Sequence, residues 1–258
     1  MIKFLKKLTI KNLTMRFIIE NLIYLINFYY FRVKIKNLSS KSKFNSISID
    51  LTNYLSKLCF IGGKFGTDKS ILNVKTHHQH AYTGIYNILF AHLKKKKINI
   101  AEIGIFQNSS IRMFREFFKN STIDGFEIDN QLIENARRFN LPRTNYYKID
   151  VKNPKNIEMS FKKTGKKYDI IIDDSTHKFE DQINIIYKTK KFLKDGGFLI
   201  IEDIFENKAI YSEENYYLKL KKISSEFSNI TFIKCNHKYN FSGLWFNHKL
   251  LVLNKHTK

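Results

Sequence analysis

Runs of apolar residues alternate with helical patterns along most of this chain, and this alternation leaves few folds open to it. Runs typical of strands lie at residues 98–103, 122–128, 145–149, 168–172 and 197–201. Helical patterns lie at residues 109–118, 130–139, 155–162 and 180–193. Nearly unbroken isoleucine runs are typical of parallel strands that are covered on both faces. The sequence therefore predicts a doubly wound, Rossmann-like α/β fold.

The last part of the chain predicts a different strand connection. A helical pattern at residues 213–227 precedes two strand patterns at 230–234 and 249–253, and the segment between those strands shows no helix. Parallel strands need a long crossover, which is usually helical, so we expect the last two strands to pair antiparallel. The whole prediction is a mostly parallel, seven-stranded sheet with an antiparallel last strand.

The first 46 residues differ from the rest. Residues 17–31 form an apolar run that contains Glu20 and Asn27, is shorter than the roughly 20 residues of a bilayer span, and lacks a signal cleavage site. It predicts an amphipathic helix whose apolar face needs a partner. The body of the protein, a second subunit in a homo-oligomer, and peripheral membrane contact through residues 1–33 all remain open. A polar linker at 36–46 follows, which predicts two regions, 1–46 and 47–258.

Composition narrows the choice of partners and compartment. The formal net charge of +22 would suit nucleic acid or an anionic membrane, but the basic residues are mostly lysines scattered along the chain rather than arginines on one face. Nucleic acid is therefore disfavoured as a partner. Cys59 and Cys235 are far apart and show no metal-binding spacing, which favours a reducing cytoplasm, with membrane association left open.

Acidic residues follow two of the predicted strands. Asp174 comes after the run at 168–172, with His177 three residues later, and Glu202 and Asp203 follow the run at 197–201. Carboxyl ends of parallel strands meet at one edge of a sheet, so we expect these side chains to lie close together. Three carboxylates suit a hard divalent cation such as Mg²⁺, and His177 is a candidate base beside it.

A second pattern predicts a nucleotide-like cofactor. Glu102 lies at the end of the first predicted strand, and Gly104 follows that strand and precedes a helix that begins near Ser109, an arrangement that seats such cofactors. The later glycines of a dinucleotide fingerprint are missing, which argues against NAD. Glu127 ends the second strand, with Asp129 as an alternative, and Asp150 ends the third.

With these motifs, residues 62–253 resemble the class I S-adenosylmethionine-dependent methyltransferases. Within that class the chain is most similar to the metal-dependent sugar O-methyltransferases of the macrocin and mycinamicin type. The pair Asp174 and His177 and the pair Glu202 and Asp203 carry this likeness, although Ser175 and the residue after it replace the family's Gly-Ser.

The resemblance implies roles for individual residues. Asp174, Glu202 and Asp203 would hold Mg²⁺ or a similar divalent cation, and His177 would be the catalytic base. Glu127 would accept the ribose hydroxyls of S-adenosylmethionine. The residues expected at the cofactor are Lys69, Tyr82, Glu102, Gly104, Ser109, Glu127 and Asp150.

The resemblance also implies a reaction, methyl transfer to a sugar hydroxyl of a glycan or a glycosylated metabolite. Two alternatives stay open at this point. One is a metal-dependent hydroxylase of the cephalosporin-hydroxylase type, which carries a similar acidic cluster. The other is a non-catalytic basic module that binds RNA or lipid through the lysines and the N-terminal helix.

Overall fold

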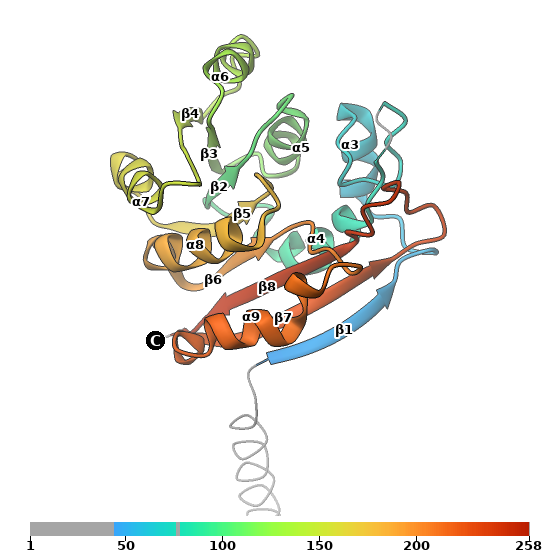
Figure 1. The fold of residues 1–258 in the computed structure, drawn as a ribbon. Coiled ribbons are helices and arrows are strands. Elements are labelled where there is room, and N and C mark those ends of the chain that lie inside the picture. The colour runs from blue at the N-terminus through green and yellow to red at the C-terminus, as the bar shows by residue number, and fades with distance from the viewer. Residues whose placement is uncertain (1–43, 76–77, 258) are drawn as a thin grey trace, which may run out of the picture. The chain divides into compact units, whose positions relative to one another are not determined.

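The sheet positions the acidic residues that the sequence analysis singled out. The computed structural model describes residues 44–75 and 78–257, and in this part eight strands form one sheet in the order β1-β7-β8-β6-β5-β2-β3-β4 (Figure 1). The strands are β1 (Phe44–Asp50), β2 (Asn99–Ile103), β3 (Thr122–Glu127), β4 (Thr144–Lys148), β5 (Tyr168–Asp173), β6 (Leu193–Ile201), β7 (Phe227–Asn236) and β8 (Lys249–Lys255). The α-helices are α3 (Lys57–Phe65), α4 (Tyr82–Phe90), α5 (Ser109–Phe117), α6 (Asn130–Arg137), α7 (Pro154–Lys163), α8 (Phe179–Thr189) and α9 (Glu213–Leu220).

Strand β8 is the only antiparallel member of this described sheet. It pairs antiparallel with both β6 and β7, whereas the other neighbouring strands pair parallel. The connection between β7 and β8 is a loop, which lets consecutive strands turn back on each other. The predicted doubly wound α/β class with an antiparallel last strand is therefore confirmed.

The strand count was wrong, because β1 is an eighth strand. It pairs parallel with β7 along its whole length, so Phe44 to Ser46, which the sequence pattern places in the polar linker, belong to the sheet. Five of its seven residues are exposed, and its sequence FNSISID lacks the long apolar run of the central strands. Edge strands are commonly polar, which is why the sequence pattern alone indicated a linker.

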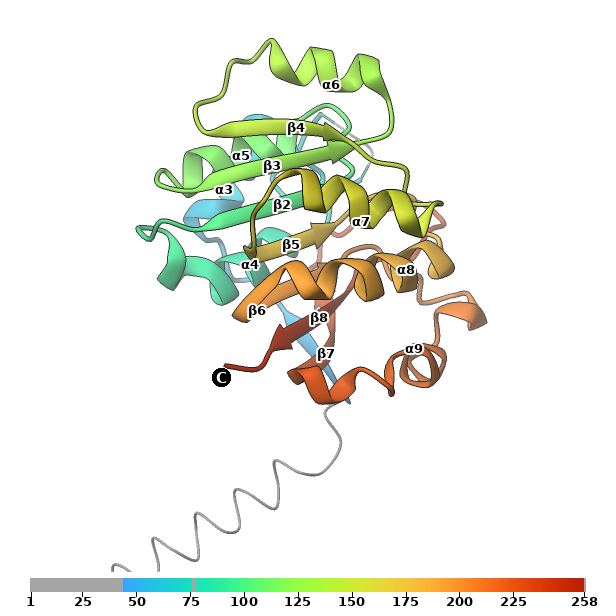
Figure 2. The ribbon, with the colours of Figure 1, turned by 90° about the vertical axis from the view of Figure 1, so that its left-hand side faces the viewer.

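Helices cover both faces of the sheet, and the sheet separates two apolar cores. One core packs α3, α4, α5 and α6 against one face, and the other packs α7, α8 and α9 against the opposite face. Figure 2 shows α7 and α8 in front of the strands and α5 and α3 behind them. Helix starts follow from local chemistry: Asp129 accepts hydrogen bonds from the first amides of α6, and Asn153 does so for α7, with Pro154 in its first turn.

Two helices are shorter than their sequence patterns indicated. The pattern at 180–193 ends as an α-helix at Thr189, and a short 3₁₀ turn (Lys190–Phe192) leads into β6, which begins at Leu193. The pattern at 213–227 ends at Leu220. Beyond it, Ser224 donates to the carbonyl of Lys221 at 2.8 Å, and this side-chain bond competes with helical pairing.

The predicted amphipathic helix at 17–31 lies outside the described residues, as does most of the linker. Their roles, and the division into regions 1–46 and 47–258, stay predictions. Within residues 44–75 and 78–257, no helix is long and apolar enough to cross a membrane.

Candidate functional site

The carboxyl edge of the sheet collects the acidic residues that the sequence singled out. Strands β2, β3, β5 and β6 run parallel, so the residues that follow them meet at one edge. Glu102 and Glu127 are buried near the ends of their strands, and Asp174, Glu202 and Asp203 come directly after β5 and β6. The predicted convergence of these segments is therefore present.

Three of the predicted residues form a compact group at this edge. Asp174, His177 and Asp203 each offer a ligand atom, and these atoms all lie within 4.8 Å of one another. The Nε2 atom of His177 is 3.6 Å from Asp203 Oδ2 and 3.9 Å from Asp174 Oδ1. His177 and Asp203 both have left-handed backbone angles, φ of 56° and 59°. Such angles are unfavourable for residues with side chains and cluster at functional sites.

Glu202 is not a member of this group and pairs with a buried lysine instead. Its Oε2 atom accepts from Lys69 Nζ at 2.6 Å, and its Oε1 atom accepts from the hydroxyl of Tyr86. Lys69 also pairs with Asp174 and lies 3.5 Å from Glu102 Oε1. The structure thus brings together Asp174, His177 and Asp203, and Glu202 as a metal ligand would have to leave its present partners.

Lys69 is itself a central part of the site. Its side chain is 1% exposed and its ammonium contacts three carboxylates. Burial alone would lower the pKa of Lys69, but Asp174, Glu202 and Glu102 raise it well above its ordinary value, so the side chain stays protonated. Burial also raises the pKa of Glu102 to about 7 despite the lysine beside it.

The group holds more negative than positive charge, which suits a cation. Burial raises the pKa of Asp174, and Asp203 adds to this effect as a second acid nearby. Burial would lower the pKa of His177, but Asp203, Asp174 and Asp173 together raise it. The two carboxylates at these distances fit a divalent ion, with positions left for water or substrate oxygens, and the His177 imidazole lies beside them.

The Tyr82 side chain contacts Asp203, and two histidines pack next to it. The Tyr82 hydroxyl donates to Asp203 Oδ1 at 2.8 Å, and its ring stacks on His80 with centroids 4.7 Å apart. The Nδ1 atoms of His80 and His248 are 2.9 Å apart. Tyr82 is fully buried, so its position here fixes the carboxylate that it contacts.

A cavity of about 320 Å³ adjoins the acidic group on the β2, β3 and β4 side. Gly104, Glu127, Asp150 and Asp174 are among its lining residues. Both Glu127 oxygens accept backbone amides, with Ile128 N at 2.8 Å the shortest contact. The Asp150 carboxylate accepts a hydrogen bond from the amide of Lys152 at 3.0 Å, which stabilises a turn. Asp150 also lines the cavity.

Gly104 allows two parts of the cavity wall to lie against each other. Gly104 has φ of 85°, and a Cβ added there would lie 2.0 Å from the Asp174 carbonyl oxygen. Only glycine therefore lets the turn after β2 pass against the turn after β5. Ser109 is the first residue of α5 and is half-buried, and Asp129, the alternative to Glu127, caps α6 instead.

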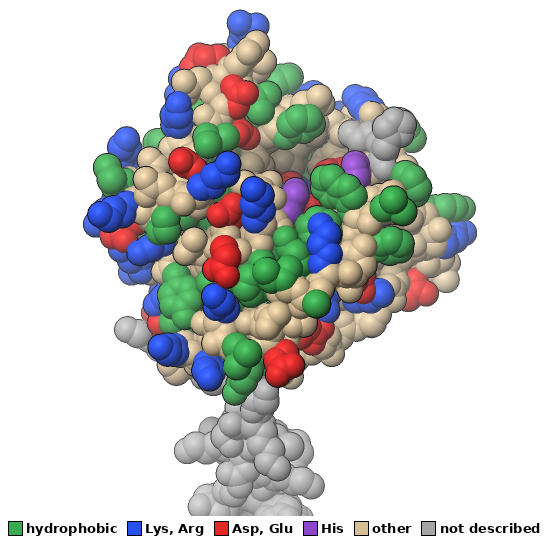
Figure 3. Space-filling view, viewed as in Figure 1, with side chains coloured by type: hydrophobic (Ala, Val, Ile, Leu, Met, Phe, Trp, Pro, Cys, Tyr) green, Lys and Arg blue, Asp and Glu red, His purple; other side chains and the backbone are tan. Residues whose placement is uncertain are grey.

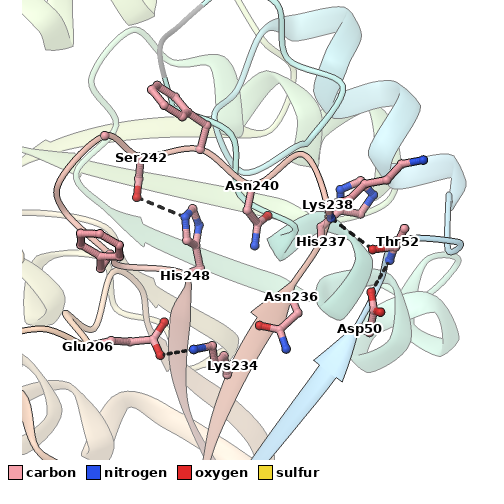
Figure 4. Close-up of a pocket in the computed structure, with 13 residues that line it drawn as sticks. Asp50, Thr52, Glu206, Lys234, Asn236, His237, Lys238, Asn240, Ser242 and His248 are labelled. Atoms are coloured by element: carbon pink, nitrogen blue, oxygen red, sulfur yellow. Dashed lines mark hydrogen bonds and ion pairs between the residues drawn. The ribbon is translucent and has the colours of Figure 1, made fainter.

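A second cavity, of about 540 Å³, lies at the ends of β1 and β7 and the start of β8 (Figure 4). The Lys234 ammonium is 2.6 Å from Glu206 there, and His248 donates to or accepts from Ser242 at 3.2 Å. The sequence did not predict this cavity or His248, because the loop that forms it shows no hydrophobic period. His248 connects its wall to His80 and so to Asp203.

Comparison with known proteins supports the fold. Residues 108–248 match the family described as a methyltransferase domain. A curated relative, the 8-demethyl-8-alpha-L-rhamnosyl tetracenomycin-C 2'-O-methyltransferase of Streptomyces olivaceus, is 24% identical over 132 residues, which are 48% of this chain and 33% of that protein. The chain thus spans about a third of the length of this relative.

Solved structures share the architecture at low identity. The MycE methyltransferase from the mycinamycin biosynthetic pathway, in complex with Mg and SAH, is 16% identical with a TM-score of 0.59, over 78% of this chain and 55% of that one. An O-methyltransferase from Bacillus cereus in complex with SAH is 14% identical with a TM-score of 0.52, over 80% of this chain and 95% of that one. These structures support a class I methyltransferase fold. Because the family match covers more than half of the residues, this chain belongs to the methyltransferase domain family.

Proposed function

We propose that this protein transfers the methyl group of S-adenosylmethionine to a sugar hydroxyl of a glycan or a glycosylated metabolite, with the help of a divalent cation such as Mg²⁺. The single observation that carries the proposal is the position of Asp174. It lines the cavity that includes Glu127 and Gly104, and it is also a member of the acidic group with His177 and Asp203. A donor in the cavity and a hydroxyl at the acidic group would therefore meet at this residue.

The cavity residues suit the donor. The carboxylate of Glu127 would accept hydrogen bonds from the ribose hydroxyls in place of the longer of its four amide contacts, which lie at 3.2 and 3.3 Å, while the contact to Ile128 N at 2.8 Å stays. Asp150 would lie near the adenine amino group, and Glu102, Gly104 and Ser109 near the methionine part. Lys69 is engaged by three carboxylates, so we assign it to holding these acids in place.

The acidic group suits the acceptor. Asp174 and Asp203 would hold the cation, which when bound lowers the pKa of the acceptor hydroxyl. His177 takes the hydroxyl proton on Nε2, the atom that faces both carboxylates. The acceptor oxygen then forms a bond to the methyl carbon while the carbon–sulfur bond breaks, and S-adenosylhomocysteine leaves. Tyr82 keeps Asp203 in position through its hydrogen bond.

The relatives support the choice of substrate class. One relative's name gives a 2'-O-methyltransferase of a rhamnosyl compound, and a solved MycE structure contains Mg, SAH and mycinamycin VI. Both are similar to this chain at low identity, so the acceptor and the metal are proposals for this protein.

The experiment is incubation of the full-length protein with isotopically labelled S-adenosylmethionine, Mg²⁺ and a panel of sugar acceptors, followed by mass analysis of the products. Label in the sugar product is expected. A product heavier by one oxygen instead of one CH₂ would identify a hydroxylase and overturn the proposal. Full activity in excess chelator would show that the reaction does not need a divalent cation, and that part of the proposal would be wrong.

Matched variants separate the roles. Asp203→Asn should abolish Mg²⁺-stimulated transfer while S-adenosylhomocysteine still binds, and Asp195→Asn is the control because that aspartate is 45% exposed and lies outside the site. His177→Ala should reduce turnover far more than cofactor affinity. Unchanged turnover in His177→Ala would rule out the histidine as the base.

A further inference from the structure

We propose that the sugar ring of the acceptor stacks on Trp245, beside His177. The inference rests on the proposed function and adds the residue that recognises the acceptor. Trp245 lies in the loop between β7 and β8, and its ring centroid is 6.3 Å from that of His177, with the planes inclined at 63°. A ring resting on the indole would therefore have its hydroxyls within reach of the proposed base.

The surroundings leave the indole open to a ligand. Trp245 is 47% exposed, while its ring contacts His78 at 5.2 Å and Phe205 at 6.0 Å between centroids. Both contacts are tilted, with ring planes inclined at 54° and 43°, and almost half of the tryptophan surface stays exposed. Figure 3 shows hydrophobic side chains gathered beside the histidines at the hollow in this face.

The loop is anchored on both sides of the tryptophan. The amide of Trp245 donates to the carbonyl of Ser242 at 3.2 Å, which closes a turn. The amide of Glu206 donates to the carbonyl of Phe246 at 2.9 Å, which ties the loop to the segment after β6. An anchored aromatic loses little conformational freedom when a ligand binds, which favours affinity.

The chemistry of this surface fits a saccharide. A sugar ring has an apolar C–H face, which packs on an aromatic ring, and a polar edge, which needs hydrogen-bond partners. The cavity of Figure 4 adjoins the same loop, through Phe246, and offers such partners. Among the described residues, His237 Nε2 and Asn240 Oδ1 are buried without a hydrogen-bond partner. In this cavity the negative charges of Asp50 and Glu206 balance the positive charges of two lysines, Lys234 and Lys238. This balance favours a neutral sugar over a phosphate.

Trp245 is the one tryptophan in the sequence, so its fluorescence reports on this position alone. The experiment titrates the full-length protein, with S-adenosylhomocysteine and Mg²⁺ present, with the sugar acceptor that accepts label in the transfer assay. A saturating change of tryptophan emission is expected, with a midpoint near the KM for that sugar. Constant emission up to saturating sugar would overturn the inference.

Variants give a second readout. Trp245→Ala should raise the KM for the sugar about tenfold or more, with a smaller change of kcat, because aromatic anchors contribute that much to binding. The KM of Trp245→Phe should lie between those of the wild type and Trp245→Ala, since phenylalanine keeps a smaller aromatic ring. Leu244→Ala is the control, because Leu244 is the neighbouring residue and is 84% exposed. The KM of this variant for the sugar should stay at the wild-type value.

The outcomes separate the inference from the proposed function. S-adenosylhomocysteine binding by calorimetry checks that each variant is folded. An unchanged KM in Trp245→Ala would overturn the stacking role and leave methyl transfer standing. A response of the emission to an aglycone without its sugar, and none to the sugar, would also overturn it. Absence of transfer to any sugar by wild-type protein that binds S-adenosylhomocysteine would overturn the proposed function and the inference with it.

Discussion

Gly104 is the residue at which the turn after β2 passes against the turn after β5. Since a Cβ there would lie 2.0 Å from the Asp174 carbonyl oxygen, Gly104→Ala must move one of the two turns. The matched control is Gly165→Ala, which has φ of 65° but open space around the added Cβ. The control should cost about 1–2 kcal/mol for the left-handed angle alone.

We expect Gly104→Ala to lower the free energy of unfolding by more than the control does, and to weaken S-adenosylhomocysteine binding. Urea denaturation and calorimetry measure the two effects. Equal stability losses in both variants would show that the two turns are not in contact.

Lys69 offers a second test at the residue scale. Lys69→Met should destabilise the protein by about 3–5 kcal/mol, because it leaves buried carboxylates without their counter-charge. Adding Glu202→Gln removes one of these carboxylates, so the double variant should recover part of the loss. Urea denaturation of the wild type, both single variants and the double variant measures the coupling. Additive losses would show that Lys69 and Glu202 do not interact in solution.

The paired histidines predict a pH dependence. Burial lowers the pKa of both His80 and His248 to about 4, from an ordinary value of 6.5. A histidine whose pKa is lowered by folding stabilises the native state above pH 6.5, and this stability is lost as the pH falls towards 4. His248→Gln should make this loss shallower, and His92→Gln, at an exposed position, should not. Thermal unfolding between pH 7 and 4 in the presence of chelator measures this loss of stability. If the Tm fell equally steeply with pH in the wild type and in His248→Gln, the prediction would be wrong.

Some of the site could be predicted residue by residue. Asp174 and Asp203 converge because they follow neighbouring parallel strands, and the sequence shows such strands as isoleucine runs. The partners of Glu202 could not be predicted, because Lys69 and Tyr86 come from the segment between β1 and β2, where the sequence shows no pattern that points to Glu202. Trp245 could not be predicted either, since no period marks its loop.

At the scale of elements, β1 is an edge strand with five of its seven residues exposed. It lies at the sheet edge, and Phe44 packs edge-on against Tyr217 with centroids 5.1 Å apart. Phe44→Ala removes a half-buried ring and should cost about 1 kcal/mol of local stability. Hydrogen exchange of the β1 amides should quicken in this variant.

The control for β1 is Ile47→Ala, because Ile47 is 44% exposed on the same strand. Its amides should exchange at the wild-type rate. If the β1 amides of the wild type already exchanged as fast as in an unfolded peptide, the pairing of β1 with β7 would be wrong.

Elements with long apolar runs were predictable, and those that depend on neighbours were not. Strands β2, β5 and β6 are buried on both faces, so their sequences carry isoleucine runs that identify them. Strand β1 is stabilised by pairing with β7 more than by its own side chains, and such pairing leaves no mark in the sequence. The ends of α8 and α9 were misplaced for a similar reason, since local turns override helix propensity there.

At the scale of the whole molecule, the cavity that we propose for the cofactor joins residues from β2, β3 and β5 that are far apart in the sequence. A ligand that fills it binds the folded chain and not the unfolded one, so it should stabilise the protein as a whole. At a concentration one hundred times its Kd, S-adenosylhomocysteine should add about 2.7 kcal/mol.

The measurement is the Tm in a concentration series of S-adenosylhomocysteine, with NAD as the control ligand because the turn after β2 lacks the later glycines of a dinucleotide site. The Tm should rise steadily with the logarithm of the S-adenosylhomocysteine concentration and stay constant with NAD. Glu127→Gln should shift this rise to higher concentrations, because the amide can accept at only one of its two terminal atoms. An equal rise with both ligands would mean that the cavity selects only the adenosine part, and the specificity that we assign to the methionine side would then be wrong.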